Sequence, residues 1–240
     1  MNSRLIKIIA VVAMTVDHVG VLLFPEIDAL RIIGRIAMPL FCLLIAFGVT
    51  KTRNPLKYFL RLFVFAVAVQ IGFTIFNTIT SGNSGYNETW NVFFTLAFGV
   101  AAAWLLGTCI KIATDKSEMP LGRFVQMAAS FMGAAALVLA AQLLPFDYGS
   151  AGVLLVVLFY LALRHSVLAM KITAAAALAV FNLVLCFAYV PWPVQWWSFL
   201  ALPFVWLFTD KKLKISPIEK YAFYIYYPLH FAVIYLVGSL

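Results

Sequence analysis

Nine long apolar segments fill almost the whole chain, and they restrict its possible folds more than any other feature. A helix needs about 20 mostly apolar residues to cross the hydrocarbon core of a bilayer, with a range of about 17–25. Short breaks rich in Pro, Gly and Asn separate the segments. We therefore expect an all-α, polytopic membrane helical bundle with about nine transmembrane helices, or eight to ten because the sixth and eighth segments are short. The segments are 4–24, 30–50, 57–79, 90–110, 123–144, 149–164, 170–190, 194–209 and 219–239.

The composition favours the bilayer as the solvent of this chain. Hydrophobic residues make up 65% and charged residues 11% of its 240 residues, whereas a soluble domain has about 45–50% apolar and about 25% charged residues. The net charge of +8 is explained by Lys and Arg in short loops, so we expect no nucleic-acid partner. The three cysteines lack the spacing of metal ligands, so we expect no metal site. Because no loop is long enough to fold separately, residues 1–240 are expected to form a single integral-membrane domain.

Basic residues alternate between the two sets of predicted loops, and this alternation predicts an orientation. Loops on the cytoplasmic side of a membrane carry an excess of Lys and Arg. We therefore expect the N-terminus in the cytoplasm and the C-terminus outside. The first set of loops holds Arg4, Lys7, Lys51, Arg53, Lys57, Lys111, Lys116, Arg123, Arg164, Lys171, the Lys211 to Lys214 group and Lys220, and the opposite set holds Glu26, Asp28, Glu88 and Asp147, with Arg31 as its strongly basic residue.

Four ionisable residues lie inside the first two apolar segments. Asp17 and His18 are adjacent in the first segment, while Arg31 and Arg35 lie four residues apart in the second and so share one face of a helix. Ionisable groups inside a span cost at least a few kcal/mol, so they must face protein or a water-filled cavity. The two helices are expected to be antiparallel neighbours, which would let Arg35 or Arg31 pair with Asp17. Two interpretations stay open: a structural ion pair with His18 as a bystander, or a functional site with His18 as a general base.

Further polar residues fall within other segments. Gln70 and Asn91 lie in the third and fourth segments, where they would either hydrogen-bond between helices or contact a substrate. The last segment holds His230, with Tyr227 about one turn before it, and Pro228 is expected to loosen the backbone there. We expect His230 to line a cavity.

Six of these segments, taken in order, resemble the TraX family, and the resemblance covers nearly the whole chain. Most of the motifs are weak individually, but the ordered set is specific, above all Asp17-His18 followed by Gly34-Arg35. That family is similar to the larger group of membrane acyltransferases that includes acyltransferase-3 proteins and heparan glucosaminide N-acetyltransferase, and its best-known member acetylates the N-terminus of conjugative pilin. The segments are "MTVDHVG", "RIIGRIAMPLFCLLIAFGVTKT", "YFLRLFVFAVAVQ", "NVFFTLAFG", "DYGSAGVLLVVLFY" and "FYIYYPLHF".

The resemblance implies a multi-pass enzyme of the bacterial cytoplasmic (inner) membrane that transfers an acetyl group from acetyl-CoA, its co-substrate. The acceptor would be an amine or hydroxyl at the external side, on a pilin-like peptide or on a small molecule or glycan of the envelope. His18 matches the catalytic histidine. The predicted catalytic residues are His18, Asp17 and Arg35, and the residues predicted to bind substrate or cofactor are Arg31, Gln70, Asn91, Tyr227 and His230.

Several alternatives stay open at this stage. Transfer could be direct or could pass through an acetyl-imidazole on His18. The chain could instead be a proton-coupled transporter that uses Asp17, His18 and His230 as a relay, although its sequence shows no repeated halves. It could also be a non-catalytic pilus or envelope assembly protein.

Overall fold

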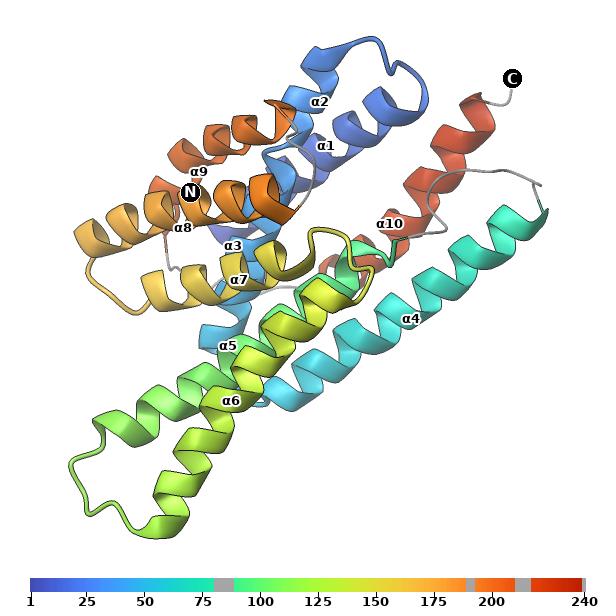
Figure 1. Ribbon diagram of the computed structural model, residues 1–240. Coiled ribbons are helices and arrows are strands. Elements are labelled where there is room, and N and C mark those ends of the chain that lie inside the picture. Colours follow the sequence, from blue (N-terminus) through green and yellow to red (C-terminus); the bar gives the residue numbers. More distant parts are fainter. Residues whose placement is uncertain (80–88, 189–192, 210–216, 239–240) are drawn as a thin grey trace. The chain divides into compact units, whose positions relative to one another are not determined.

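The computed structural model describes residues 1–79, 89–188, 193–209 and 217–238, and nearly all of them are helical (Figure 1). The only extended pairing in these ranges is an isolated bridge between Trp90 and Phe146. The all-α prediction is therefore confirmed for the described residues, whereas Glu88 and the Lys211 to Lys214 group lie outside them. The elements are α1 (Ser3–Leu22), α2 (Asp28–Gly34), α3 (Ala37–Lys51), α4 (Pro55–Ile79), α5 (Val92–Thr114), α6 (Leu121–Leu143), α7 (Gly149–Ala162), α8 (Val167–Ala188), the 3₁₀ helix η2 (Pro193–Ala201), α9 (Leu202–Trp206) and α10 (Pro217–Gly238).

Six stretches of the described chain are long and apolar enough to cross a membrane, which identifies a membrane protein. Two further apolar helices, Gly149–Ala162 and Ala222–Gly238, are shorter. The described residues of the predicted eighth segment form not one long α-helix but η2 followed by α9, and Pro203, which cannot donate a backbone hydrogen bond to the preceding turn, lies at the start of α9. The count of nine spans stays a prediction. The six stretches are Ser3–Leu22, Asp28–Lys51, Pro55–Phe76, Val92–Thr114, Leu121–Leu143 and Val167–Leu185.

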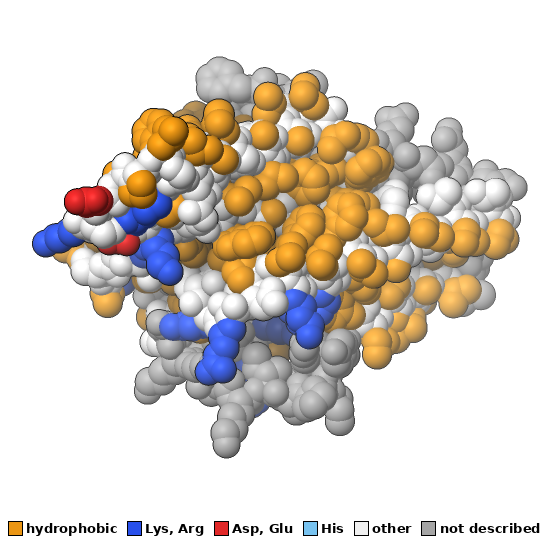
Figure 2. All heavy atoms as spheres, turned by 90° about the horizontal axis from the view of Figure 1, so that it is seen from below, with side chains coloured by type: hydrophobic (Ala, Val, Ile, Leu, Met, Phe, Trp, Pro, Cys, Tyr) orange, Lys and Arg blue, Asp and Glu red, His pale blue; other side chains and the backbone are white. Residues whose placement is uncertain are grey.

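Large hydrophobic side chains lie exposed along these helices. Ile71 and Ile75 on α4, and Phe131 and Met132 on α6, each expose more than half of their surface. Figure 2 shows hydrophobic side chains spread over much of one face, with Lys and Arg gathered in separate groups. Monomeric soluble proteins rarely expose apolar patches of this kind, and lipid is the solvent that suits them.

The chain divides into two compact units, which are described separately. The first comprises Met1–Leu44 and Val167–Leu240, and the second comprises Ile45–Ser166. In the first unit α1 packs against α2 and α10, while η2 packs against α2, α8 and α9. In the second unit α5 is central and packs against α4, α6 and α7.

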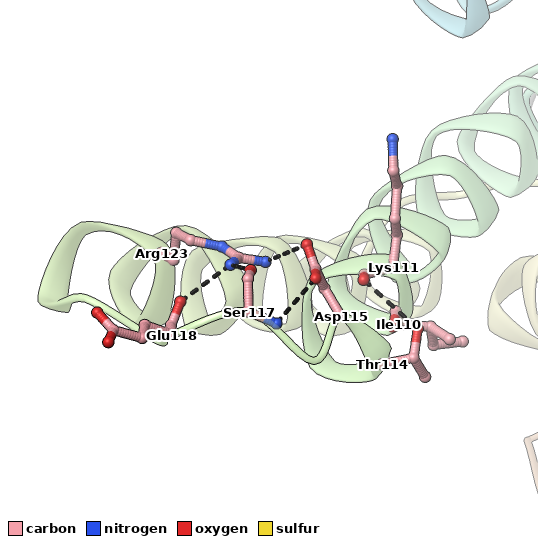
Figure 3. A network of polar contacts seen from close by, with 7 residues as sticks. All are labelled: Ile110, Lys111, Thr114, Asp115, Ser117, Glu118 and Arg123. Atoms are coloured by element: carbon pink, nitrogen blue, oxygen red, sulfur yellow. Dashed lines mark hydrogen bonds and ion pairs between the residues drawn. The ribbon is translucent and has the colours of Figure 1, made fainter.

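The α5–α6 turn closes one end of the second unit with a polar network (Figure 3). The Asp115 carboxylate accepts hydrogen bonds from the backbone N–H of Ser117 at 3.0 Å and from Arg123 at 2.8 Å. The bond from the Ser117 backbone, followed by the Ser117 side chain and Arg123, lowers the pKa of the Asp115 carboxyl below its ordinary value. Both side chains are partly exposed, so this ion pair orders the turn and contributes little to stability.

A break between α2 and α3 interrupts the predicted second segment at Arg35. Pro39 is the third residue of α3 and lacks the N–H that would bond the carbonyl of Arg35, four residues earlier. The Arg35 N–H itself bonds the carbonyl oxygens of Arg31 and Ile32 at 3.1 and 3.2 Å. The helix therefore tightens and ends at the position where the sequence places a buried arginine.

Two glycines allow α1 and α2 to approach each other closely. A Cβ added at Gly20 would lie 2.7 Å from Cβ of Leu30, and a Cβ added at Gly34 would overlap the carboxylate of Asp17. The Gly34 position therefore has no space for a side chain while Asp17 keeps its place. The absence of a Cβ at this position, rather than an unusual backbone conformation, explains the glycine.

Replacing Gly34 with Ala is expected to lower the thermal unfolding midpoint of the detergent-purified protein, because the new methyl must displace Asp17. Gly72→Ala is the matched control, since a Cβ there meets no atom within 4 Å and Ala is favoured over Gly in helices by about 0.8–1.0 kcal/mol. Fluorescence-detected size exclusion after heating measures both midpoints. An unchanged midpoint in Gly34→Ala would contradict the close packing at Asp17.

Candidate functional site

An ion pair between α1 and the end of α2 lies at the centre of the first unit's polar residues. Asp17 Oδ1 accepts a hydrogen bond from Nη2 of Arg35 at 2.5 Å and lies 3.5 Å from Nε of Arg31. Arg35 is 3% exposed, and the side chain of Asp17 is 14% exposed. The predicted pairing of Asp17 with Arg35 or Arg31 is therefore confirmed, and both arginines take part.

Gln195, on η2, is a second partner of Arg35. Arg35 Nη1 donates to Oε1 of Gln195 at 3.3 Å, and Arg35 Nε donates to the carbonyl oxygen of Arg31 at 3.4 Å. Because a guanidinium can only donate, the amide oxygen of Gln195 must face Arg35, which fixes the orientation of the amide. Its Nε2 is buried and has no hydrogen-bond partner among the described residues. Buried donors of this kind are rare in native proteins and require an explanation.

A second polar contact joins α1 to α10 through two histidines. Nδ1 of His18 lies 2.7 Å from Nε2 of His230, and the two rings stack with their centroids 5.0 Å apart. Nδ1 of His230 lies 3.1 Å from the carbonyl oxygen of Tyr226. Phe231 and Tyr227 enclose the pair, with ring centroids 4.3 Å from His18 and 5.5 Å from His230, respectively.

The contacts between α1 and α10 show that these helices run parallel. Near the start of each helix, Nζ of Lys7 lies 5.3 Å from the ring centroid of Phe223. Farther along both helices, His18 contacts His230. Since α1 and α10 begin at the same end of the first unit, Asp17, His18 and His230 lie toward the opposite end.

The residues of the Asp17 ion pair, the Gln195 bond and the histidine contact are together named the α1–α2–α10 cluster. It comprises acid–base groups, two guanidiniums and one free amide donor, and in the described residues no three His, Cys, Asp or Glu side chains gather as metal ligands do. An imidazole beside fixed cations can exchange a proton, and the guanidinium and amide N–H groups can stabilise a developing negative charge. The members are Asp17, His18, Arg31, Arg35, Gln195, Tyr227 and His230.

Gln70 and Asn91 are brought together with each other, in the second unit. Nδ2 of Asn91 donates to Oε1 of Gln70 at 3.0 Å and to the carbonyl oxygen of Ala66 at 2.9 Å, and the Asn91 backbone N–H also bonds Gln70 at 3.0 Å. The structure thus contains the interhelical hydrogen bond that the sequence left open. The substrate-binding role of the two residues stays a prediction.

Comparison with known proteins identifies the family of this chain. The sequence model of the TraX protein family matches residues 2–238. The chain belongs to the TraX family. This TraX family protein is 30% identical over 246 residues to the probable fimbrial assembly protein FimC, serogroup H1, of Dichelobacter nodosus, an alignment that covers 95% of this chain and 92% of that protein.

A shorter similarity links this TraX family protein to an uncharacterized protein of Rickettsia prowazekii (strain Madrid E). The two are 44% identical over 71 residues, which cover 30% of this chain and 27% of that protein. No solved structure matches the chain significantly. The predicted family is thus confirmed over almost the whole sequence.

The sequence predicted most members of the cluster and the ion pair of Asp17, but not the contact between His18 and His230. Asp17, Arg31 and Arg35 carry a clear signal because charges are rare in apolar segments. Gln195 was missed, since it lies among tryptophans in a segment expected to be a plain span. The partner of His18 is His230 rather than Asp17, and only the fold brings these two segments together.

Single substitutions in the ion pair are expected to cost more than the double substitution. Asp17→Asn leaves the buried Arg35 without its carboxylate, and Arg35→Gln leaves Asp17 with the more distant Arg31 alone. Losing one partner of a buried ion pair costs about 3–5 kcal/mol in comparable cases. The double variant should recover part of the lost folded yield, measured by size exclusion in detergent. Asp115→Asn and Arg123→Gln, which break the exposed pair, provide the control and should change the folded yield little. Strictly additive losses at Asp17 and Arg35 would contradict their energetic coupling.

Proposed function

We propose that this TraX family protein is a membrane-embedded acetyltransferase that moves an acetyl group from acetyl-CoA to an amine or hydroxyl at the external side of the bacterial inner membrane. The observation that carries the proposal is the α1–α2–α10 cluster: His18 is adjacent on α1 to Asp17, which binds the buried guanidinium of Arg35, and Arg35 binds Gln195, whose amide donor has no partner among the described residues. Acyl transfer needs a base that takes the proton of the acceptor and hydrogen-bond donors that stabilise the negative charge on the carbonyl oxygen, and the cluster offers both.

In the proposed reaction, His18 takes the proton of the acceptor N–H or O–H while the acceptor nitrogen or oxygen bonds to the thioester carbonyl carbon. The carbonyl oxygen then carries the negative charge until the carbon–sulfur bond breaks. The sulfur leaves with the electron pair of that bond and takes the proton from His18. The products are the acetylated acceptor and free coenzyme A, and His18 returns to its starting state. A positioned base of this kind contributes about 10²–10⁴-fold in rate.

Gln195 and Arg35 are the candidates for stabilising the carbonyl oxygen in this reaction. Gln195 Nε2 is buried without a hydrogen-bond partner among the described residues, so its bond to an oxyanion would replace no existing contact. Arg35 also holds Asp17 and the Gln195 amide oxygen, so it keeps that donor in place. An oxyanion donor that is fixed in advance requires no reorganisation during the reaction.

Near the start of α4, in the second unit, two cations offer donors suited to a phosphate group. Lys57 and Arg61 lie four residues apart on α4, and the Arg61 guanidinium lies 5.2 Å from the ring centroid of Tyr58. Nε of Arg61 is buried and has no hydrogen-bond partner among the described residues. Fixed cations with free donors bind phosphate groups well.

The acceptor is assigned to the envelope. The relative from Dichelobacter nodosus is named a probable fimbrial assembly protein, which supports a pilin-like peptide as the acceptor. That name equally suits a non-catalytic assembly protein, our second candidate function. The α1–α2–α10 cluster favours the enzyme, because assembly alone gives the unpaired Gln195 donor no partner.

His18→Ala is expected to abolish acetyl transfer and leave the protein folded, since His18 belongs to no ion pair within the described part of the chain and its removal there leaves no buried charge without a partner. Purified protein in detergent is mixed with acetyl-CoA and a peptide bearing a pilin-like N-terminus, and free thiol and acetylated peptide are measured. His165→Ala is the control, because His165 is exposed in the turn after α7. Equal turnover in wild type and His18→Ala would remove His18 from the mechanism.

The proposed orientation places the N-terminus in the cytoplasm and the C-terminus outside. Because α1 and α10 run parallel, both would cross the membrane in the same direction, which requires an odd number of spans. This supports the placement of the N-terminus and the C-terminus on opposite sides of the membrane. In a variant without Cys42, Cys109 and Cys186, a cysteine placed at residue 84 should react with a membrane-impermeant reagent on intact cells. A cysteine at residue 116, in the α5–α6 turn, should react only after permeabilisation. The reverse pattern would overturn the orientation.

A further inference from the structure

His230 makes two polar contacts that together determine where its protons lie. It is 5% exposed, on α10. Its Nδ1 faces the carbonyl oxygen of Tyr226 at 3.1 Å, and its Nε2 faces Nδ1 of His18 at 2.7 Å. The ring of Tyr226 lies parallel to the imidazole, with an interplanar angle of 4° and centroids 5.2 Å apart, which restrains the ring's orientation.

The carbonyl contact fixes the tautomer of His230. A carbonyl oxygen can only accept, so Nδ1 of His230 must carry the hydrogen of this bond. In a neutral imidazole the other nitrogen then has a free lone pair. Nε2 of His230 is therefore an acceptor, and the hydrogen between the two histidines belongs to Nδ1 of His18. A neutral His18 with its hydrogen on Nδ1 has its own lone pair on Nε2.

The charges around the pair oppose the alternative in which His230 is a cation that donates from both nitrogens. Arg31 and Arg35 from α2 bring two positive charges, and Asp17 from α1 brings one negative charge. Among the described residues, Tyr226 and Tyr227 from α10 also contact His230, and neither is a cation. An additional positive charge on His230 would add to the excess of positive charge among these groups.

We propose that His230 is a positioning residue that holds His18 in the tautomer with its hydrogen on Nδ1, so that Nε2 of His18 is the nitrogen that takes the acceptor's proton. The catalytic consequence of this inference rests on the proposed function, whereas the tautomer of His18 does not depend on it. When Nε2 of His18 gains a proton, the Nδ1–H bond to His230 remains and strengthens, because a charged donor makes the stronger hydrogen bond. The neutral acceptor thus stabilises the imidazolium without adding a second charge.

Two substitutions separate this role from simple packing. His230→Phe keeps an aromatic ring against Tyr226 but offers no acceptor to His18. His230→Gln provides an amide oxygen that can accept from Nδ1 of His18. A packing role predicts that Phe is tolerated at least as well as Gln, whereas the positioning role predicts that Gln retains more activity than Phe.

The direct test is the nitrogen NMR spectrum of ¹⁵N-histidine-labelled protein in liposomes at neutral pH, with the His165→Gln variant used to assign the three histidines. We expect Nδ1 of His18 to be protonated and Nε2 to be bare in wild type and in His230→Gln. The hydrogen should shift toward Nε2 in His230→Phe. A protonated Nε2 on His18 in wild type, or an unchanged tautomer in His230→Phe, would overturn the proposal, whether or not the protein transfers acetyl groups.

Activity gives the second measurement. His230→Phe is expected to lower kcat for acetyl transfer by about 10–100-fold, by analogy with the loss of a hydrogen-bond partner that orients a metal-ligating histidine, with KM for acetyl-CoA unchanged. His230→Gln should retain most of the activity. Equal kcat in wild type and His230→Phe would show that His230 only packs. If wild type shows no transfer, the proposed function fails, and the NMR result still decides the role of His230.

Discussion

The Asp17–Arg35 ion pair is the interaction on which the rest of the first unit depends. A carboxylate on α1 and a guanidinium at the end of α2 neutralise each other where lipid would otherwise make each of them costly. Gly34 provides the space for Asp17, and the lack of an N–H on Pro39 ends the helix at Arg35. Arg35 in turn orients the amide of Gln195 on η2. One buried charge pair thus determines the positions of three elements.

The same pair leaves His18 available for proton transfer. Asp17 is engaged by both arginines, so His18 finds its partner on α10 instead. A histidine bonded to a carboxylate would be stabilised as a cation. A histidine bonded to the neutral acceptor of His230 can remain uncharged and, in the proposed reaction, would still donate from Nδ1 after gaining a proton. This division of roles explains why Asp17 and His18, which are adjacent in the sequence, bond to different helices.

The sequence predicted the helical class, the family and the ion pair, because apolar length and buried charge are local signals. It did not predict the contact between His18 and His230, since 212 residues separate them and periodicity carries no information about which helices pack together. Gln195 was missed for a related reason: its amide matters only through Arg35, and its segment forms a 3₁₀ helix where a long α-helix was expected. Gln70 and Asn91 were correctly singled out as polar, but their mutual bonds depend on the packing of α4 against α5.

The central claim is that acyl transfer takes place at the α1–α2–α10 cluster. The most direct measurement uses an acetyl-CoA analogue with a photoreactive acyl group, bound to the purified protein, irradiated and mapped by peptide mass spectrometry. We expect the crosslinks to fall on α1, α2, η2 or α10 beside His18, Arg35 and Gln195, and to disappear when unlabelled acetyl-CoA competes. Crosslinks that compete with acetyl-CoA but map only to helices outside the cluster would contradict the account.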